Sequence, residues 1–242
     1  MTIGNLTWDE QGQHYYYTGI DAVALYVWDK TINKDGTTTN PTGWFGAPVA
    51  WSGVTAVNES PSGAESNKMY ADNIEYLNLL SKEEFGLTLE CYQVPEAFDA
   101  CDGISPVDVL GAIKVRGQSR AAFGLVYRVQ KGSDTTAAGD LGYVYHIVYG
   151  CKASPSSRDF ATVNDSPEAQ TFSYEITTTP LTDSTIMTYF PGVNSIIHME
   201  IDSTDLTSEQ KDALEEALYG TNGSTPTHMV TPDELSSILD AA

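Results

Sequence analysis

The chain has 242 residues, of which 41% are hydrophobic and 10% aromatic, and its 33 acidic and 12 basic residues give a formal net charge of −21. This composition is typical of a globular protein with a sizeable core, and the length suits one large domain, alone or with an appendage. An acidic surface repels phosphates, which argues against a domain that grips nucleic acid, and the charge fits high solubility, cation binding or a surface that faces DNA without adhering to it.

The N-terminal segment MTIGNLTWDEQGQ has neither a basic nor an apolar stretch, so no secretory signal peptide is expected. No run along the chain approaches the roughly 20 apolar residues that cross a membrane, and no membrane partner is expected. The three cysteines, Cys91, Cys101 and Cys151, form no CxxC pair. Reduced thiols in a cytoplasm are therefore expected.

The first half of the chain predicts two strands separated by long loops. Ala22–Trp28 is short and almost continuously apolar, which predicts a strand buried on both faces. Leu87–Tyr92 alternates, with its leucines and Cys91 on one face. The segments 30–46 and 57–68 are polar and rich in glycine or serine, and loops of this length are usually functional or ordered by a partner.

The second half continues the β pattern. Phe123–Val129 and Tyr143–Tyr149 predict a hairpin, and Thr171–Thr177 and Ser195–Ile201 predict two further strands. A third long loop spans 151–168. Strands separated by Gly, Ser, Pro and Asp turns, with few helices between them, predict an antiparallel β-sandwich or barrel.

Helices are few. Pro95–Cys101 predicts a short one that ends at Gly103. Thr207–Tyr219 predicts a helix with a threonine cap and a glycine stop, and Thr231–Asp240 a second one with a threonine cap and a proline at its first position. We therefore expect a mainly β domain over 1–201 with loops at 30–46, 57–68 and 151–168, and an acidic helical C-terminal appendage over 202–242.

The sequence offers no recognisable chemistry. It contains no GxxxxGK[ST], GxGxxG, HExxH or GxSxG motif. The four histidines are scattered, and His146 lies inside an apolar strand, where a lone histidine is more often a packing or interface residue than a catalyst. We expect no catalytic residue, no cofactor and no metal ligand, and hence no enzyme. A hydrolase with a non-standard site is the least favoured alternative.

Several blocks together resemble the major tail proteins, or tail tube proteins, of long non-contractile-tailed bacteriophages. The blocks are GVTAVNESPSGAESNKMYADNIEY (53–76), EFGLTLECYQVPEAFDACDG (84–103), GQSRAAFGLVYR (117–128), the run 142–180 and the closing YGTNGSTPTHMVTPDELSSIL. The likeness extends over most of the chain from about Gly19 onward. These blocks are typical of structural segments and contain no catalytic motif.

The resemblance implies a β-sandwich with a flanking helix, six copies of which close a ring around a lumen. Rings stack into the tube that conducts DNA from the capsid to the host. The partners implied are other copies of the chain and other tail proteins, while genomic DNA passes through the lumen without specific binding. The location implied is the virion, after synthesis in the bacterial cytoplasm. The loops 30–46 and 57–68 are candidate arms that reach the next ring and order on stacking.

Four residues are candidate subunit contacts. Arg158 and Asp159, in the loop SPSSRDF, are suited to bridging neighbours, and Trp44 and Phe45 lie near the end of the glycine-rich loop 30–46. An alternative function from another class is a tail-tip adhesin or carbohydrate-binding module built on a β-sandwich. Such a module would use exposed aromatic residues such as Trp44, Phe45 and Trp51.

Overall fold

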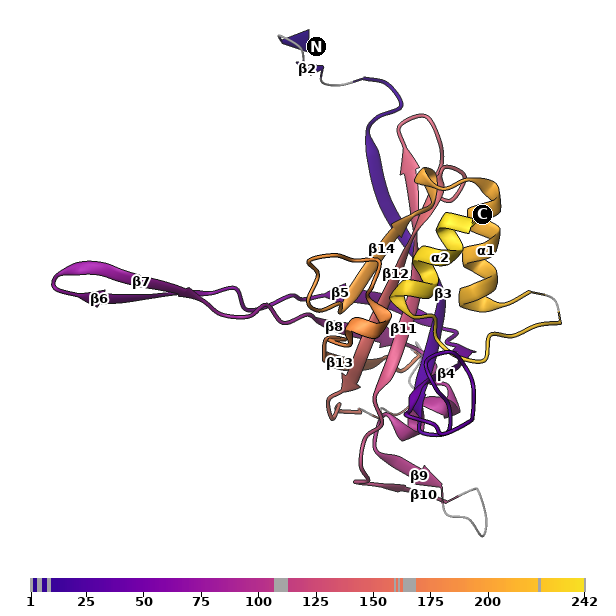
Figure 1. Ribbon diagram of the computed structural model, residues 1–242. Coiled ribbons are helices and arrows are strands. Elements are labelled where there is room, and N and C mark those ends of the chain that lie inside the picture. Colours follow the sequence, from indigo (N-terminus) through magenta and orange to yellow (C-terminus); the bar gives the residue numbers. More distant parts are fainter. Residues whose placement is uncertain are drawn as a thin grey trace.

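The computed structural model describes residues 2–3, 6–7, 10–106, 113–158, 160, 162, 169–221 and 223–241. In this part of the chain the fold is mainly β and is built on an eight-stranded antiparallel sheet (Figure 1). The strands of this sheet are β3 (Tyr15–Asp29), β4 (Trp44–Ala50), β5 (Val54–Glu59), β8 (Gly86–Cys91), β11 (Phe123–Ser133), β12 (Gly142–Ala153), β13 (Phe172–Thr178) and β14 (His198–Asp202).

Smaller elements decorate this sheet. Three two-stranded pairs lie outside it: β1 (Thr2–Ile3) with β2 (Leu6–Thr7), β6 (Ser66–Ala71) with β7 (Ile74–Leu80), and β9 (Ile104–Pro106) with β10 (Lys114–Arg116). The helical elements are the 3-10 turns η1 (Glu96–Ala100), η2 (Ser184–Ile186) and η3 (Ser203–Asp205), and the α-helices α1 (Ser208–Tyr219) and α2 (Pro232–Ala241). No helix in the described ranges combines the length and the apolar character needed to cross a bilayer.

The large sheet folds into two layers around a core. Its strand order is β4-β3-β11-β12-β13-β8-β5, and β14 pairs with the N-terminal half of β12, while β13 pairs with the C-terminal end of β12. Leu25 and Leu125 from one layer pack in the same cluster as Leu89 and Tyr174 from the other. The architecture agrees with the predicted antiparallel β-sandwich.

The second core lies on the opposite face of the β3–β11–β12 layer, under the two helices. Leu214 and Leu218 of α1 and Leu235 of α2 pack against Tyr26 and Tyr145 of the sheet. The phenol of Tyr26 also donates a hydrogen bond to the backbone oxygen of Leu218. Because β3 contributes side chains to both cores, the prediction of a strand buried on both faces is confirmed.

The C-terminal helices are more integrated than the predicted appendage. Their caps are as expected: the hydroxyl of Thr207 and the side chain of Gln210 form a capping box at α1, and Thr231 and Glu234 exchange the equivalent bonds at α2. The predicted boundary at 201/202, however, falls inside β14. Since the helices share a core with the sheet, they form one packed unit with it.

Other predicted elements keep their place and change their length. The β11–β12 hairpin exists but extends further than the pattern indicated, leaving a tip of only 134–141. The short helix at 95–101 is a single 3-10 stretch anchored by the buried ring of Phe98. Gly103 follows it with φ 68°, a left-handed conformation that favours glycine.

Candidate functional site

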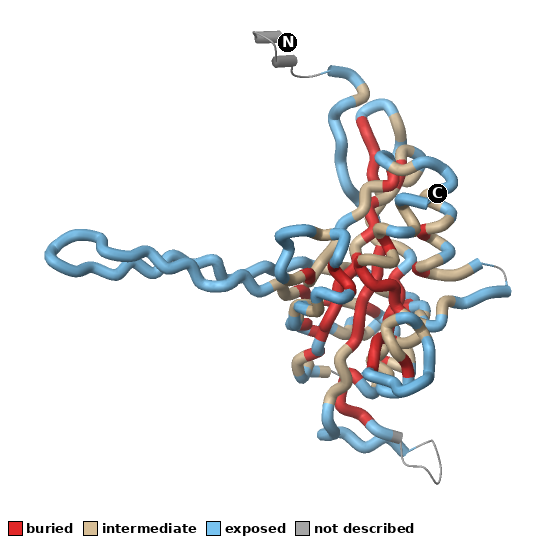
Figure 2. Tube along the Cα trace, viewed as in Figure 1, coloured by how far each residue is buried: buried red, intermediate tan, exposed pale blue. Residues whose placement is uncertain are grey.

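The most prominent feature of the molecule is a hairpin arm, defined here as residues 62–84, that projects away from the body (Figures 1 and 2). It begins at a bridge between Ser62 and Glu84 and contains β6 and β7. At its tip Asp72 and Asn73 have φ of 51° and 63°, as a two-residue type I′ turn requires. With a rise of about 3.3 Å per residue, an arm of this length reaches roughly 35 Å.

All residues of β6 and β7 are exposed, although many are apolar. The large apolar side chains that the arm exposes are Met69, Tyr70, Ile74, Tyr76, Leu77, Leu79 and Leu80. Leu79 and Leu80 are 48% and 72% exposed, and adjacent residues of a strand point to opposite faces. Both faces of the arm therefore present apolar surface, which in a soluble protein usually marks an interaction site.

The two loops that the sequence singled out as candidate arms differ in structure. The segment 57–68 is not a loop, because it spans the end of β5, the root of the arm and the first residues of β6. The segment 30–46 folds back on itself around Asn33, whose side chain bonds Thr37, Thr39 and Thr42. Lys34 also pairs with Asp183 of the body. Of these two segments, only 57–68 contributes to a projecting arm.

The aromatic residues proposed as contact residues lie in the core, which corrects two predictions. Trp44 and Phe45 are 2% and 1% exposed and pack edge-on against each other with their ring centroids 5.0 Å apart. Trp51 is 3% exposed and donates from Nε1 to the backbone oxygen of Gln93 at 2.8 Å. Their large apolar area is buried inside the subunit, so these side chains are not available to a neighbouring subunit or a glycan.

Arg158 has its partners within the chain. Its Nη2 lies 2.9 Å from Oδ2 of Asp102 and 3.0 Å from the hydroxyl of Tyr174. The Asp102 side chain is 3% exposed and also has Arg116 and Arg120 at 3.4 Å. Three of the four arginines thus surround one buried carboxylate. Asp159, the predicted companion of Arg158, lies outside the described residues.

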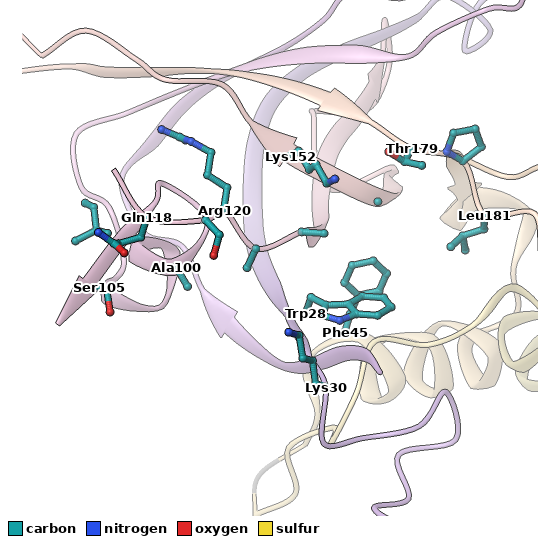
Figure 3. Close-up of a pocket in the computed structure, with 16 residues that line it drawn as sticks. Trp28, Lys30, Phe45, Ala100, Ser105, Gln118, Arg120, Lys152, Thr179 and Leu181 are labelled. Carbon is teal, nitrogen blue, oxygen red and sulfur yellow. The ribbon is translucent and has the colours of Figure 1, made fainter. Parts of the chain in front are cut away.

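A cavity of about 690 Å³ lies beside this arginine cluster (Figure 3). Trp28 and Phe45 form an aromatic wall with ring centroids 5.2 Å apart, and Lys30, Arg120 and Lys152 supply cationic groups. The described lining contains hydroxyl and cationic side chains but no carboxylate, histidine or cysteine. The three thiols are weak nucleophiles, because burial raises the pKa of Cys91 and Cys151 and raises that of Cys101 to about 12.

A histidine pair was missed by the sequence analysis. The imidazoles of His146 and His198 stack with centroids 5.1 Å apart and bring Nδ1 of His146 within 3.0 Å of Nε2 of His198. Oε1 of Glu59 lies 3.4 Å from the same Nδ1 and accepts a 2.5 Å bond from the hydroxyl of Tyr127. Burial lowers the pKa of both histidines, and for His146 the neighbouring His198 lowers it further.

A scan against protein-family models finds no matching family, and a search of curated proteins finds no significant match. The class that the fold itself defines is a mainly β, antiparallel two-layer protein with a projecting hairpin.

Proposed function

We propose that this chain is a self-assembling structural subunit of a bacteriophage tail tube and not an enzyme. In this proposal six copies form a ring, and stacked rings form the hollow tube of a long non-contractile tail that conducts DNA to the host. The blocks of sequence that resemble major tail proteins support the proposal. The observation that carries it is the projecting arm with apolar side chains on both faces.

The arm needs a partner for physical reasons. An isolated two-stranded hairpin is marginally stable in water, and apolar side chains gain stability only when they leave it. The arm turns away from the body, so its own subunit does not cover it (Figure 2). A second copy of the chain is the partner we propose, because repeating one such contact builds a ring or a stack without any other component.

The large sheet offers a complementary feature. Strand β4 pairs with β3 only from Ala24 to Asp29, while β11 pairs with β3 from Tyr15 onward. Within the described ranges, one edge of the first third of β3 therefore has no strand partner. Tyr15 and Tyr17 on this segment are 54% and 60% exposed. An open edge of this kind accepts a strand from another chain.

The charge suits a conduit for DNA. A ring of six chains would carry a formal charge on the order of −126 before counter-ions bind. Acidic side chains facing the bore would repel DNA phosphates and let DNA slide, while salt limits this repulsion to a range of about 8–10 Å. The proposed location is accordingly the virion tail, with other tail proteins as further partners.

Electron microscopy and sedimentation of the purified chain test the proposal. Wild-type protein should form rings or tubes as its concentration rises. The double variant Tyr76→Ser/Leu80→Ser removes two exposed apolar side chains of the arm and should stay monomeric with an unchanged unfolding temperature. The control variant Tyr189→Ser removes an exposed aromatic residue of the body and should assemble. The proposal would be contradicted if the arm variant assembled at the concentrations at which the wild-type protein assembles.

An adhesin or carbohydrate-binding module is the second candidate. In the sequence analysis this candidate relied on three aromatic residues that prove to be buried, Trp44, Phe45 and Trp51. The arm instead exposes Tyr70 and Tyr76 by 68% and 73%, and exposed tyrosines suit stacking on sugar rings. Glycan-array binding by a chain that stays monomeric at high concentration would favour this candidate over the tube subunit.

A further inference from the structure

The Glu59–His146–His198 cluster has no role in the assembly argued above. Its three side chains come from strands far apart in the sequence. His146 lies on β12 and His198 on β14, and the register pairs His198 with Val148 and His146 with Glu200. The two histidines are therefore diagonal neighbours on one face of the sheet, a position from which long side chains meet. Glu59 ends β5, in the other layer of the sandwich.

The geometry of the cluster is that of a metal site. Zinc bonds imidazole nitrogen and carboxylate oxygen at about 2.0–2.2 Å, so two ligand atoms of a tetrahedral site lie about 3.3 Å apart. Here the two nitrogens are 3.0 Å apart, Nδ1 of His146 is 3.4 Å from Oε1 of Glu59, and all three ligand atoms lie within 4.8 Å of one another. Small side-chain adjustments would bring the three atoms around one ion.

The surroundings support the same role. Both imidazoles are 12% exposed, and their facing nitrogens lie 3.0 Å apart in a hydrogen bond that a metal ion would replace. The ring that donates this hydrogen bond would bind the ion in its other tautomer, because a ligating nitrogen carries no proton. Nδ1 of His198 faces Oε1 of Glu200 at 3.8 Å, which is longer than a hydrogen bond, and a small side-chain movement would form the carboxylate–histidine pair that orients a metal ligand. Tyr127 stacks on His146 with an interplanar angle of 4° and holds Glu59 through its hydroxyl. The ligands are thus fixed by neighbours.

An entry path is present. A cavity of about 660 Å³ borders the cluster and is lined by Glu59, His198 and Glu200, together with Glu83 and Lys82 from the end of the arm. Acidic side chains at its wall attract cations. The cavity also provides space for a water or a further carboxylate at the fourth position of a tetrahedral ion.

We propose that Glu59, His146 and His198 bind one divalent transition-metal ion, with Zn²⁺ as the ion that two imidazoles and a carboxylate suit best. The ion would join the two layers of the sandwich close to the start of the arm, because Glu59 ends β5 three residues before the Ser62–Glu84 bridge. Metal binding would stabilise the folded subunit, since the unfolded chain does not hold these three groups together.

Cobalt and zinc titrations of the EDTA-treated full chain test this proposal. Co²⁺ should give the visible absorption bands of a tetrahedral site at one equivalent, Zn²⁺ should displace it, and Zn²⁺ should raise the unfolding temperature. His146→Gln, His198→Gln and Glu59→Gln should each weaken Zn²⁺ binding by more than the roughly 10- to 100-fold that loss of an outer-shell partner costs. The Glu59 side chain is 33% exposed against 12% for each histidine, so Glu59→Gln disturbs the packing of the folded chain least.

His228→Gln is the matched control, because His228 also faces a glutamate, Glu234 at 3.3 Å, without a second histidine beside it. This variant should bind Zn²⁺ as the wild type does. The proposal is overturned if no saturable Co²⁺ spectrum appears, or if Zn²⁺ binds the His198→Gln and Glu59→Gln variants with wild-type affinity. The measurements use unassembled protein, so their outcome is independent of ring formation.

Discussion

The indole of Trp44 donates a 2.6 Å hydrogen bond from Nε1 to the backbone oxygen of Met229, and the amide of Met229 donates in return to the backbone oxygen of Phe45 at 3.0 Å. These two bonds join the edge strand β4 to the segment that precedes α2. They lie inside the helix-covered core, where an unpaired polar group is costly.

Loss of this indole should destabilise the subunit. Trp44→Phe leaves the Met229 oxygen without its donor and opens a small void, so we expect the free energy of unfolding to fall by about 1–3 kcal/mol. Urea denaturation followed by circular dichroism measures it. Trp28→Phe is the control, since that ring packs against Trp44 and Phe45 but has no indole hydrogen bond among the described contacts. Equal losses in both variants would contradict the role of the Met229 bond.

Asp102 should matter more than any one of its arginines. Asp102→Asn leaves two partly buried cations, Arg120 and Arg158, and the more exposed Arg116 without their shared counter-charge, and we expect a loss of the order of 3 kcal/mol. Arg158→Ala keeps Arg116 and Arg120 on the carboxylate and should cost about 1–2 kcal/mol. Chemical denaturation of the unassembled variants gives both values. If Arg158→Ala leaves the monomer's stability unchanged and affects assembly alone, Arg158 acts between subunits instead.

Hydrogen exchange should separate the arm from the segment 30–46. Amides of β6 and β7 are expected to exchange fast in the monomer, because the arm has little to pack against, and to become protected on assembly. The segment 30–46 should keep its protection in both states, because Asn33 and the Lys34–Asp183 pair order it within the subunit. Peptide-resolved mass spectrometry of monomer and tube measures this. Equal arm protection in both states would count against an arm that docks on a neighbour.

Asp183 should make part of the stability dependent on pH. The Lys34 ammonium, followed by the hydroxyl and amide of Thr185, holds the pKa of Asp183 well below its ordinary value. A carboxyl whose pKa is depressed by folding contributes stability above its unfolded pKa of about 4, and this contribution is lost as the pH falls through the folded value. Unfolding temperatures between about pH 5 and pH 2 should therefore fall more steeply for the wild type than for Asp183→Asn.

Lys34→Met is the partner variant for this measurement. It removes the largest cause of the shift and leaves the two bonds from Thr185, so its pH profile should lie between those of the wild type and Asp183→Asn. The prediction is wrong if both variants follow the wild-type profile, because the pair would then contribute nothing to folding in this range.

The sequence alone predicted the elements whose signals are local. Alternating leucines defined β8, and a threonine cap with its partner three residues on defined the start of α2. Patterns of this kind depend on residues a few positions apart, and they hold wherever the segment lies in the fold. The candidate metal site had no such signal, because His146 and His198 stand 52 positions apart and meet only through the register of β12 and β14.

Tertiary structure decided which apolar segments become core. Strand β7, with the sequence IEYLNLL, is as apolar as many core strands, yet all its residues are exposed, whereas Trp44 and Phe45 follow a polar loop and are buried. Composition and alternation determine that a segment can form a strand. Burial depends on which distant strands pair and which faces the helices cover, and these contacts are non-local. The sequence thus determined a β-rich acidic chain with capped helices, and only the packing determined its arm, its core and its histidine cluster.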